Sequence, residues 1–575
     1  MLLTAIKTQV ETRLESSLHN RAYIIPEQDR NPNQVEHPWS IDVKSGSKPK
    51  VRLPQNTHII TVFDQPGIAG RLLILGQPGA GKTTMLLELA QKLVERAEND
   101  LNEPIPILLS LSSWQNDQQS IADWIVAELN SGKYYKVRKD IAKQWLEEGE
   151  IIPLLDGLDE LAAERQESCV QKLNEFLQPG NWIYPLVVCS RIEEYQLYST
   201  KLALNTSLEL QPFSDEQIQE YLRRTGNEEL GNSIRNDQEL KQLAQTPFLL
   251  NVILISCQNL SLGKWQEFES SAERLNYLFA GYVEVMLERK YEVKIPLDET
   301  TKRWLGWLAG KLIEQNETEF FIEKMQPIWL KNRRHKRIYS LSVGLSVGLS
   351  VGLINGLSFG LIVGLIGGSR RTIQDIQTVE ILHLNWKNFL RAGLSFGLIN
   401  GLIGGLSFGL INGLIGGLSF GLSFGLINGL IVGLIGGRVG QRGWLFKGLR
   451  GGLESSEIET KISPNQGIWK SLQNAVIVWL SVGLIGGLSF GLSFGLSVGL
   501  SFGLSFGLIF GLANGGEACI QHLSLRIILY RCGCIPWNYA RFLDYATNRL
   551  FLQRVGGGYR FMHNLLRQHF AQNYR

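Results

Sequence analysis

The sequence has 575 residues, enough for about three or four domains, and its formal net charge at neutral pH is only +3. This small charge gives no case for a nucleic-acid-binding protein. Charged residues lie almost entirely outside three apolar blocks, so the average composition describes no single region. The six cysteines are scattered, and the lone Cys532-x-Cys534 pair lacks the second ligand pair that a structural zinc site needs. We therefore expect reduced thiols facing the cytosol.

Residues 1–57 are predicted to form an N-terminal helical linker. Apolar residues recur there at the spacing of one helix face, at Leu3, Ile6, Val10, Leu14 and Leu18. Charges at Lys7, Glu11 and Arg13 interrupt the apolar core that a secretory leader would need. An amphipathic helix is the better interpretation.

A phosphate-binding loop follows an apolar strand in residues 58–212, the predicted nucleotide-binding domain. Residues 76–83 read GQPGAGKT, which satisfies the GxxxxGK[ST] pattern between a strand and a helix. In such a loop backbone amides surround phosphate oxygens, while Lys82 neutralises the outer phosphates and the Thr83 hydroxyl holds Mg²⁺. The predicted nucleotide-binding residues here are Gly76, Gln77, Pro78, Gly79, Ala80, Gly81, Lys82, Thr83 and Thr84.

Three further strands are predicted, at 104–111, 150–155 and 185–191. The strand at 150–155 runs into DGLDEL, and an aspartate at this sheet edge lies beside the phosphate loop, so Asp156 is the expected second Mg²⁺ ligand. Asp159 and Glu160 are placed to polarise a water or bridge a second ligand, or else to cap a helix N-terminus. Arg191 ends the last strand, where it either contacts the terminal phosphate or forms a surface salt bridge.

Residues 10–337 together resemble the NACHT class of signal-transduction NTPases, relatives of the animal inflammasome and plant resistance receptors. The motifs that carry the resemblance are, in order, GQPGAGKTT, IIPLLDGLDEL, VVCSRIEEY, LQPFSDEQIQEYL and TPFLLNVIL. The resemblance implies an α/β fold with an ASCE-type parallel sheet, a helical domain over 213–337 and Pro247 packed on the base of a bound nucleotide. It favours ATP and ADP over guanine nucleotides. One departure is Ile192, where a proline commonly follows the arginine.

Three apolar blocks, at 338–368, 392–437 and 475–515, repeat a glycine at every fourth residue. In water each glycine inside a helix costs about 1 kcal/mol relative to alanine, and no charged residue lies within the blocks. In hydrocarbon the helix is enforced, and stripes of glycine and serine let helix backbones approach closely. We therefore expect membrane helices packed as glycine zippers. The alternative is β structure, because GLSF also alternates small and large residues, but barrel strands need turns about every ten residues.

The distribution of basic residues suggests how the blocks cross a membrane. Basic residues cluster at 331–337, before the first block, and recur in both linkers between the blocks. The positive-inside rule then places all three segments in the cytoplasm, so each block is a hairpin and the insert of residues 338–516 crosses six times. Four crossings, with single passes at blocks one and three, is the alternative. The linker at 372–392 is expected to be either an interfacial amphipathic helix or a plain connector.

The family resemblance resumes in residues 517–575, which look like the closing winged helix of bacterial NACHT proteins. The stretch that carries it is NYARFLDYATNRLFLQRVGGGYRFMHNLLRQHFA. It implies that His563 contacts the diphosphate of the resting state, whereas the residues alone would favour a buried core histidine. Gln568 departs from the acidic residue expected in this motif.

These observations predict a membrane-anchored STAND-type NTPase of the bacterial inner membrane, with its NTPase domains in the cytoplasm. It would act as an ATP/ADP switch with slow hydrolysis, oligomerise on activation and serve stress or antiphage defence with a membrane output. Separation of the helical domain from the winged helix would pull directly on the membrane insert that joins them. Alternatives are an NTPase-regulated channel or transporter, or a simple ATPase that serves a partner.

Overall fold

The computed structural model divides the chain into two compact units. Unit 1 comprises Met1–Phe320, Ile458–Ile462 and Ala540–Arg575, and unit 2 comprises Phe321–Glu457 and Ser463–Tyr539. The structure describes residues 2–22, 41–45, 51–52, 57–131, 135–178, 180–257, 262–289, 298–355, 376, 383–384, 453–454, 458–460, 464–494 and 496–574. The second apolar block and the C-terminal part of the first therefore lie outside the described residues, as does nearly all of the 372–392 linker.

Unit 1 is built on a seven-stranded sheet with the strand order β2-β1-β8-β3-β7-β6-β4. Five strands are parallel, and they are β3 (Arg71–Gly76), β4 (Ile105–Ser110), β6 (Ile151–Asp156), β7 (Leu186–Arg191) and β8 (Thr206–Leu210). The strands β1 (Ile41–Ser45) and β2 (Val51–Arg52) extend the β8 edge in antiparallel pairing. The predicted parallel α/β sheet is confirmed, with its four predicted strands within a residue or two of their expected ends.

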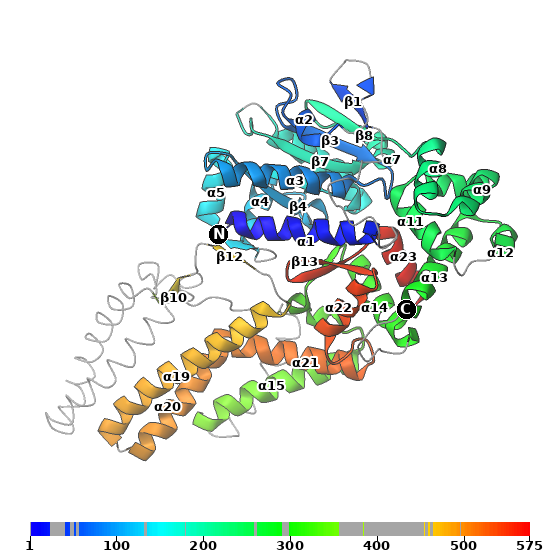
Figure 1. Ribbon diagram of the computed structural model, residues 1–575. Helices are drawn as coiled ribbons and strands as arrows, with labels where there is room; N and C mark the ends of the chain where they lie inside the picture. Colours follow the sequence, from blue (N-terminus) through cyan, green and yellow to red (C-terminus); the bar gives the residue numbers. More distant parts are fainter. Residues whose placement is uncertain are drawn as a thin grey trace. The chain divides into compact units, whose positions relative to one another are not determined.

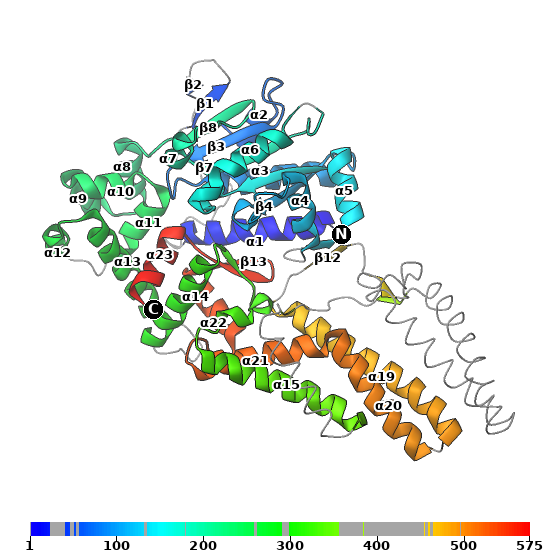
Figure 2. The same ribbon diagram turned by 180° about the vertical axis from the view of Figure 1, so that it is seen from behind.

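Helices cover both faces of this sheet. The chain moves from β3 past β7 and β6 to β4 and then returns, so right-handed crossovers place α3 on one face and α6 on the other (Figure 1, Figure 2). The helices of this part are α2 (Ile59–Phe63), α3 (Lys82–Asn99), α4 (Ile121–Asn130), α5 (Lys139–Glu148), α6 (Ala163–Phe176) and α7 (Ile192–Leu197). Because both faces are covered, the strands β3, β6 and β7 are buried along most of their length.

The N-terminal helix α1 (Leu2–Ala22) confirms that this segment is helical, and it lies alongside α3 (Figure 1). Four residues of its apolar face are buried, namely Leu2, Ile6, Val10 and Leu14. The charged residue Lys7 on its outer side donates hydrogen bonds to Glu98 of α3. The helix is thus an integral part of unit 1.

Among the described residues between 215 and 314, seven helices form the helical part of unit 1. They are α8 (Asp215–Arg224), α9 (Glu228–Asn236), α10 (Gln238–Ala244), α11 (Pro247–Ser256), α12 (Leu262–Glu267), α13 (Ser271–Glu288) and α14 (Asp298–Glu314). Capping boxes start α8, with Ser214 and Gln217, and α13, with Ser270 and Glu273. Pro247 is the first residue of α11, where its missing N–H is not needed, and most of that apolar helix is buried.

The C-terminal part of unit 1 folds around a small antiparallel sheet, β13-β14-β9. Its elements are α22 (Tyr539–Asn548), β13 (Leu552–Val555), β14 (Gly558–Phe561), α23 (Asn564–Asn573) and β9 (Glu319–Phe320). The helix α23 packs against α14, where Gly306 leaves room for the backbone of Tyr574. The buried side chain of Arg549 donates to the carbonyls of Met286 and Leu287 in α13. Another short strand, β12 (Ile458–Thr460), pairs with β5 (Tyr135–Val137).

This sheet changes the expected connection of the insert. The strand β9 precedes unit 2 in the chain, the helix α22 follows it, and β9 pairs directly with β14. Trp304 of α14 also meets Phe542 of α22 edge to face, with ring centroids 5.0 Å apart. Both ends of unit 2 therefore join the same C-terminal assembly. In this structure the two segments that flank the insert are hydrogen-bonded to each other; their separation in another nucleotide state stays a prediction.

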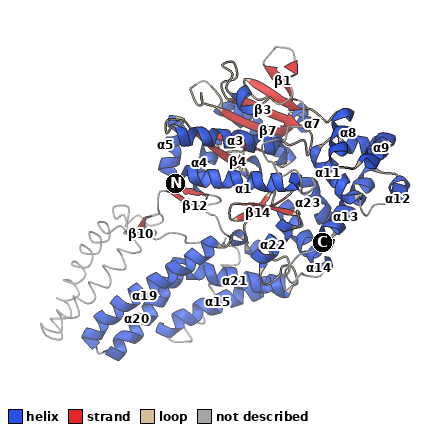
Figure 3. Ribbon diagram, in the orientation of Figure 1, coloured by secondary structure: helices blue, strands red, loops and turns tan. Residues whose placement is uncertain are grey.

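Unit 2 is almost entirely helical in its described residues (Figure 3). Its long helices are α15 (Arg333–Asn355), α19 (Gln466–Phe494), α20 (Leu496–Gly511) and α21 (Glu517–Arg531), with a π-helical turn at Leu512–Gly516 before α21. Shorter elements are the 3-10 turns Ile322–Lys324 and Pro327–Trp329 and the strand pair β10 (His383–Leu384) with β11 (Leu453–Glu454). The described parts of blocks one and three are helical, so the β alternative is wrong for these residues.

The helices α19 and α20 pack against each other along their glycines. A Cβ at Gly483 would lie 3.1 Å from the carbonyl oxygen of Gly503, and a Cβ at Gly487 would lie 3.3 Å from that of Gly499. The fourfold glycine spacing turns leucines to the outside, where Leu484 is 65% and Leu500 is 55% exposed. One stretch among the described residues, Gly499–Arg531, is helical and long enough to cross a membrane, and an 18-residue window within it has a mean hydropathy of 1.2.

Candidate functional site

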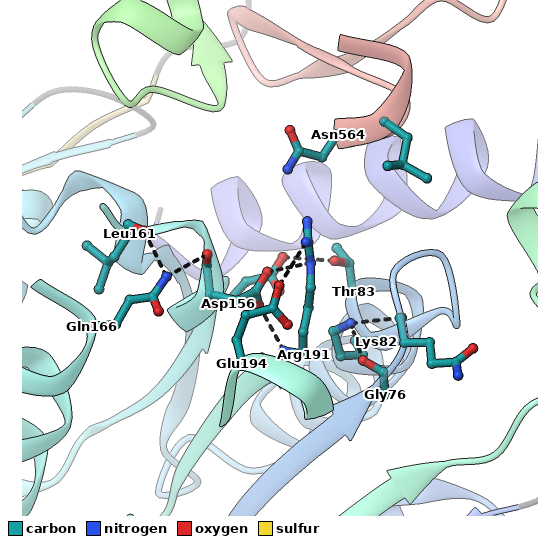
Figure 4. Close-up of polar contacts among 12 residues, drawn as sticks. Gly76, Lys82, Thr83, Asp156, Leu161, Gln166, Arg191, Glu194 and Asn564 are labelled. Atoms are coloured by element: carbon teal, nitrogen blue, oxygen red, sulfur yellow. Dashed lines mark hydrogen bonds and ion pairs between the residues drawn. The ribbon is translucent and has the colours of Figure 1, made fainter. Parts of the chain in front are cut away.

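The glycine-rich loop between β3 and α3 has the geometry of a phosphate-binding loop. Gly79 and Gly81 adopt φ angles of +82° and +99°, which L-residues with a side chain rarely take. Gly81 precedes the first turn of α3 without any side-chain cap, so the turn presents its backbone N–H groups to the loop. The Nζ atom of Lys82 folds back and donates to the carbonyls of Gly76 at 2.9 Å and Gln77 at 3.1 Å (Figure 4). Burial lowers the pKa of Lys82.

Two oxygen-bearing side chains meet beside this loop, at the carboxyl end of the parallel strands. The Thr83 hydroxyl donates to Asp156 Oδ2 at 2.9 Å (Figure 4). Asp156 is the last residue of β6, and the strand order brings this strand close to β3 through β7. A hydroxyl and a carboxylate are hard oxygen donors of the type that Mg²⁺ prefers, so the pair fits the expected metal side of the site.

Asp159 and Arg191 bind each other. Arg191 Nε lies 2.8 Å from Asp159 Oδ2, the backbone N–H of Arg191 donates to Asp159 Oδ1 at 3.0 Å, and Arg191 Nη1 lies 3.1 Å from Glu194. Burial raises the pKa of Asp159 although Arg191 and Lys82 act in the opposite direction. The sequence suggested separate roles for the two residues, on water and on phosphate. In this structure each holds the other in place at the sheet edge.

Glu160 lies one residue further along the chain, is half-buried and faces the C-terminal part of unit 1. Burial raises its pKa to about 7, and the charges of Arg560 and Arg567 pull that pKa down only in part. Gly157 turns the chain here with a φ of +78°, and a Cβ at that position would lie 2.8 Å from Glu160 Oε2. The glycine thus lets the carboxyl group fold back over the turn.

A cavity of about 230 Å³ lies over the phosphate loop and is lined by three parts of unit 1. The sheet edge provides Pro78, Gly79, Gly81, Lys82, Thr83, Thr84, Asp156, Asp159, Glu160 and Arg191. The helix α11 provides Pro247, Phe248 and Asn251, and the C-terminal part provides Arg560, His563, Asn564 and Arg567. Of the predicted nucleotide-binding residues, Gly76, Gln77 and Ala80 do not line it. Gly76 and Gln77 instead supply the carbonyls that hold Lys82.

His563 lies next to the phosphate loop, as its predicted role requires. Its ring stacks on Phe248 with centroids 4.0 Å apart, and its Nδ1 accepts a hydrogen bond from the backbone N–H of Leu565 at the start of α23. A Cβ at Gly79 would lie 3.5 Å from His563 Nε2, so the second ring nitrogen is directed at the loop. Burial, together with the charges of Arg191, Lys82 and Arg560, lowers the pKa of His563 to about 3. The imidazole is therefore neutral at physiological pH.

Among the described residues, three arginines from outside the seven-stranded sheet also line this cavity, and they were not among the residues predicted from the sequence. Arg560 Nη1 lies 3.8 Å from Asp156 Oδ2, and Arg567 lines the same wall. Arg13 of α1 lines the cavity as well and forms a buried ion pair with Glu319 at 2.6 Å. The available signal was the position of Arg560 and Arg567 around His563, three residues before it and four after it. That spacing puts Arg567 one helical turn beyond His563.

Three comparisons with known proteins gave matches. A model of the NACHT domain matches residues 71–229. An uncharacterized WD repeat-containing protein of Nostoc sp. is 24% identical over 220 residues, which are 33% of this chain and 14% of that relative. The crystal structure of Cdc6p from Pyrobaculum aerophilum is 16% identical, with a TM-score of 0.21, and the match covers 44% of this chain and 70% of that one.

The family match covers the strands β3 to β8, the phosphate loop, the Thr83–Asp156 pair and the Asp159–Arg191 pair. The WD-repeat relative is matched over only about a seventh of its length, so the match tells nothing of its other domains. Residues 71–229 of this chain form a NACHT domain with a P-loop NTPase fold. Domains of this kind are expected to bind a nucleotide.

Proposed function

We propose that the protein is a membrane-anchored NACHT NTPase that works as an ATP/ADP switch. One observation carries the proposal: a single cavity is lined by the phosphate loop, by α11 and by the C-terminal elements β14 and α23. A nucleotide in this cavity would contact all three parts at once. Its phosphate state would then decide how tightly they hold together, because a ligand stabilises the arrangement that it binds best.

The residues of the cavity divide the work of binding. Lys82 would leave the carbonyls of Gly76 and Gln77 for the outer phosphates, and Thr83 with Asp156 would hold Mg²⁺. The metal supplies charge neutralisation at the transferring phosphate when it is bound. Pro247 would pack on the base. His563 would use its loop-facing Nε2 on the diphosphate, since its Nδ1 is already engaged by the start of α23.

Asp159 and Glu160 have different parts in this proposal. Asp159 fixes the Arg191 side chain at the edge of the sheet, where the guanidinium can meet the terminal phosphate. Glu160 is the better candidate for orienting a water, because it lines the cavity and its raised pKa suits proton transfer near neutral pH. Hydrolysis would be slow and would serve to reset the switch.

Unit 2 would anchor this switch in a bilayer. The glycines of α19 and α20 face each other, while the outward leucines offer lipid an apolar surface. Because both ends of unit 2 join the C-terminal assembly, we expect movement of that assembly to rotate or tilt the helices together. A bacterial stress or antiphage role with membrane disruption as the output would fit this coupling, as would assembly into homo-oligomers.

The test uses the full chain purified in detergent, with ADP, with ATP and Mg²⁺, or with no nucleotide. We expect larger particles with ATP and Mg²⁺ than with ADP by light scattering, and no such difference for Lys82→Ala. Identical particle sizes in all states would contradict the switch. Membrane anchoring is tested separately by floating the protein with lipid vesicles after an alkaline wash. Recovery in the soluble fraction would contradict it.

A further inference from the structure

Arg560 lies in the cavity beside the pair formed by Thr83 and Asp156. Its guanidinium Nη1 lies 3.8 Å from Asp156 Oδ2, the same oxygen that accepts the hydrogen bond from Thr83. Its charge is also the largest influence that lowers the pKa of the half-buried Glu160. A single positive charge from the C-terminal part thus acts on two carboxylates of the NACHT domain.

Arg560 is presented by a rigid element. It belongs to β14, the middle strand of the small sheet, and pairs with Gln553 of β13 on one side and with Glu319 of β9 on the other. Glu319 is itself held by the buried ion pair with Arg13. The backbone of Arg560 is thus held from both sides, so a movement of the sheet as a whole would carry its guanidinium away from Asp156.

The guanidinium places a positive charge next to Asp156. A metal ion held by Thr83 and Asp156 would also place a positive charge there. Asp156 is 18% and Arg560 17% exposed, so water screens the two side chains only in part. A carboxylate that has a guanidinium beside it attracts a divalent cation less strongly, because part of its charge is already neutralised. Conversely, a cation bound at Asp156 neutralises that carboxylate and so weakens its attraction for the Arg560 guanidinium.

We propose that Arg560 is a charge switch that makes docking of the β13-β14-β9 sheet and binding of Mg²⁺ compete for Asp156. The docked sheet would favour a metal-free diphosphate, and Mg²⁺ bound with a triphosphate would favour release of the sheet. This inference rests on the proposed nucleotide switch and names the residue that couples the metal to it. The coupling is reciprocal: docking weakens the metal by the factor by which the metal weakens docking.

The experiment measures binding of Mn²⁺, as a probe for Mg²⁺, by electron paramagnetic resonance of the full chain in detergent with saturating ADP. We expect Arg560→Gln to bind Mn²⁺ about tenfold more tightly than the unmodified protein, which is a typical size for coupling between sites. Arg560→Lys keeps the charge and should stay close to the unmodified protein. Added Mg²⁺ should displace the Mn²⁺ in every variant.

Arg554→Gln is the matched control. Arg554 lies on β13 of the same sheet but does not line the cavity, and the substitution removes the same charge as Arg560→Gln. It should leave the Mn²⁺ affinity unchanged. Equal Mn²⁺ affinities of Arg560→Gln and the unmodified protein, both with ADP bound, would overturn the inference and leave the nucleotide switch intact. Failure of the unmodified protein to bind any nucleotide would instead overturn the switch itself.

A second measurement decides the matter if Arg560→Gln fails to fold or to bind ADP. Hydrogen exchange of residues 558–561 in the unmodified protein with ADP should speed up when Mg²⁺ is added, because undocking of the sheet would open its cavity-facing side to water. Exchange that is the same with and without Mg²⁺ would contradict the competition between metal and sheet.

Discussion

The NACHT domain and the hairpin of α19 and α20 both depend on glycine, but for different physical reasons. In the phosphate loop Gly79 and Gly81 are needed for their backbone, because each takes a positive φ that a side chain would disfavour. In the hairpin Gly483 and Gly503 sit in regular helix, and what matters is the missing side chain, which lets two backbones touch. The first use is local and the second is a repeated surface.

This difference predicts how each region responds to substitution. In unit 1 a few side chains make specific bonds, so single replacements should have large and well-separated effects. In the hairpin the packing is spread over many equivalent positions, so one replacement should weaken it by a smaller step. Four substitutions, from the largest expected effect to the smallest, test this comparison.

Arg549→Ala should destabilise unit 1 the most. The buried guanidinium donates to the carbonyls of Met286 and Leu287, and its loss leaves both acceptors without that donor. We expect a loss of about 3 kcal/mol, since each orphaned buried group costs about 1–3 kcal/mol. Chemical unfolding of the full chain in detergent gives the value. Arg554→Ala, in the neighbouring hairpin, should cost far less, and an equal loss for the two would show that the contact to α13 is unimportant.

Lys82→Ala should abolish most nucleotide binding and leave the fold intact. Removing one charge-assisted contact to phosphate should weaken ADP binding about 100-fold, or about 2.8 kcal/mol. Titration with a fluorescent ADP analogue measures this. Lys92→Ala is the control, because Lys92 lies on the same helix and bonds only to Glu95 on the surface. Comparable losses for both variants would contradict the assigned loop.

Gly503→Val should loosen the α19–α20 hairpin. The added side chain would collide with the backbone of Gly483 and Gly487, and such overpacking costs about 1–3 kcal/mol. Leu504→Ala, at the next residue, changes an outward-facing side chain and should have little effect on the pairing. Cross-linking of cysteines placed in the two helices, in lipid vesicles, reports the pairing. Similar cross-linking yields for the two variants would argue against backbone contact at the glycines.

Glu160→Gln should change the pH dependence of protein stability. Near pH 5 the variant and the unmodified protein should differ least in stability. The folded-state pKa of Glu160, about 7, lies above its usual value of 4.5, so folding favours the protonated carboxyl. Its contribution is fully present below pH 4.5 and is lost as the pH rises through 7. The melting temperature of the nucleotide-free protein should therefore fall less between pH 5 and 8 in the variant. If the melting temperatures of the variant and the unmodified protein changed in parallel with pH, Glu160 would be more exposed to water than the structure indicates.

Short sequence motifs identified the phosphate loop and the residues at the ends of the predicted strands. The loop, Thr83 with Asp156 and the four strands follow from short apolar runs and their end residues. Two things escaped this reasoning. Asp159 and Arg191 bind each other across neighbouring strands, which depends on strand order and not on spacing. Arg560 reaches Asp156 from the far end of the chain, and the β14 sequence GYRF does not reveal which partner its arginine meets.

The fold shows the same limit. The strand β8 was not predicted, because its TSLEL sequence is buried only at alternate residues and lacks a continuous apolar run. The return of β9 to pair with β14 could not be inferred either, since unit 2 separates them in the chain. Helix in the described parts of blocks one and three was predicted correctly, because stripes of glycine and serine let helix backbones pack closely.

The central claim is that one nucleotide contacts the phosphate loop, α11 and the C-terminal assembly together. Hydrogen exchange of the full chain in detergent, with and without ADP, tests this claim most directly. The account predicts slower exchange in three separate segments, residues 79–85, 248–254 and 558–566, and unchanged exchange in α19 and α20. Protection confined to residues 79–85 would contradict it.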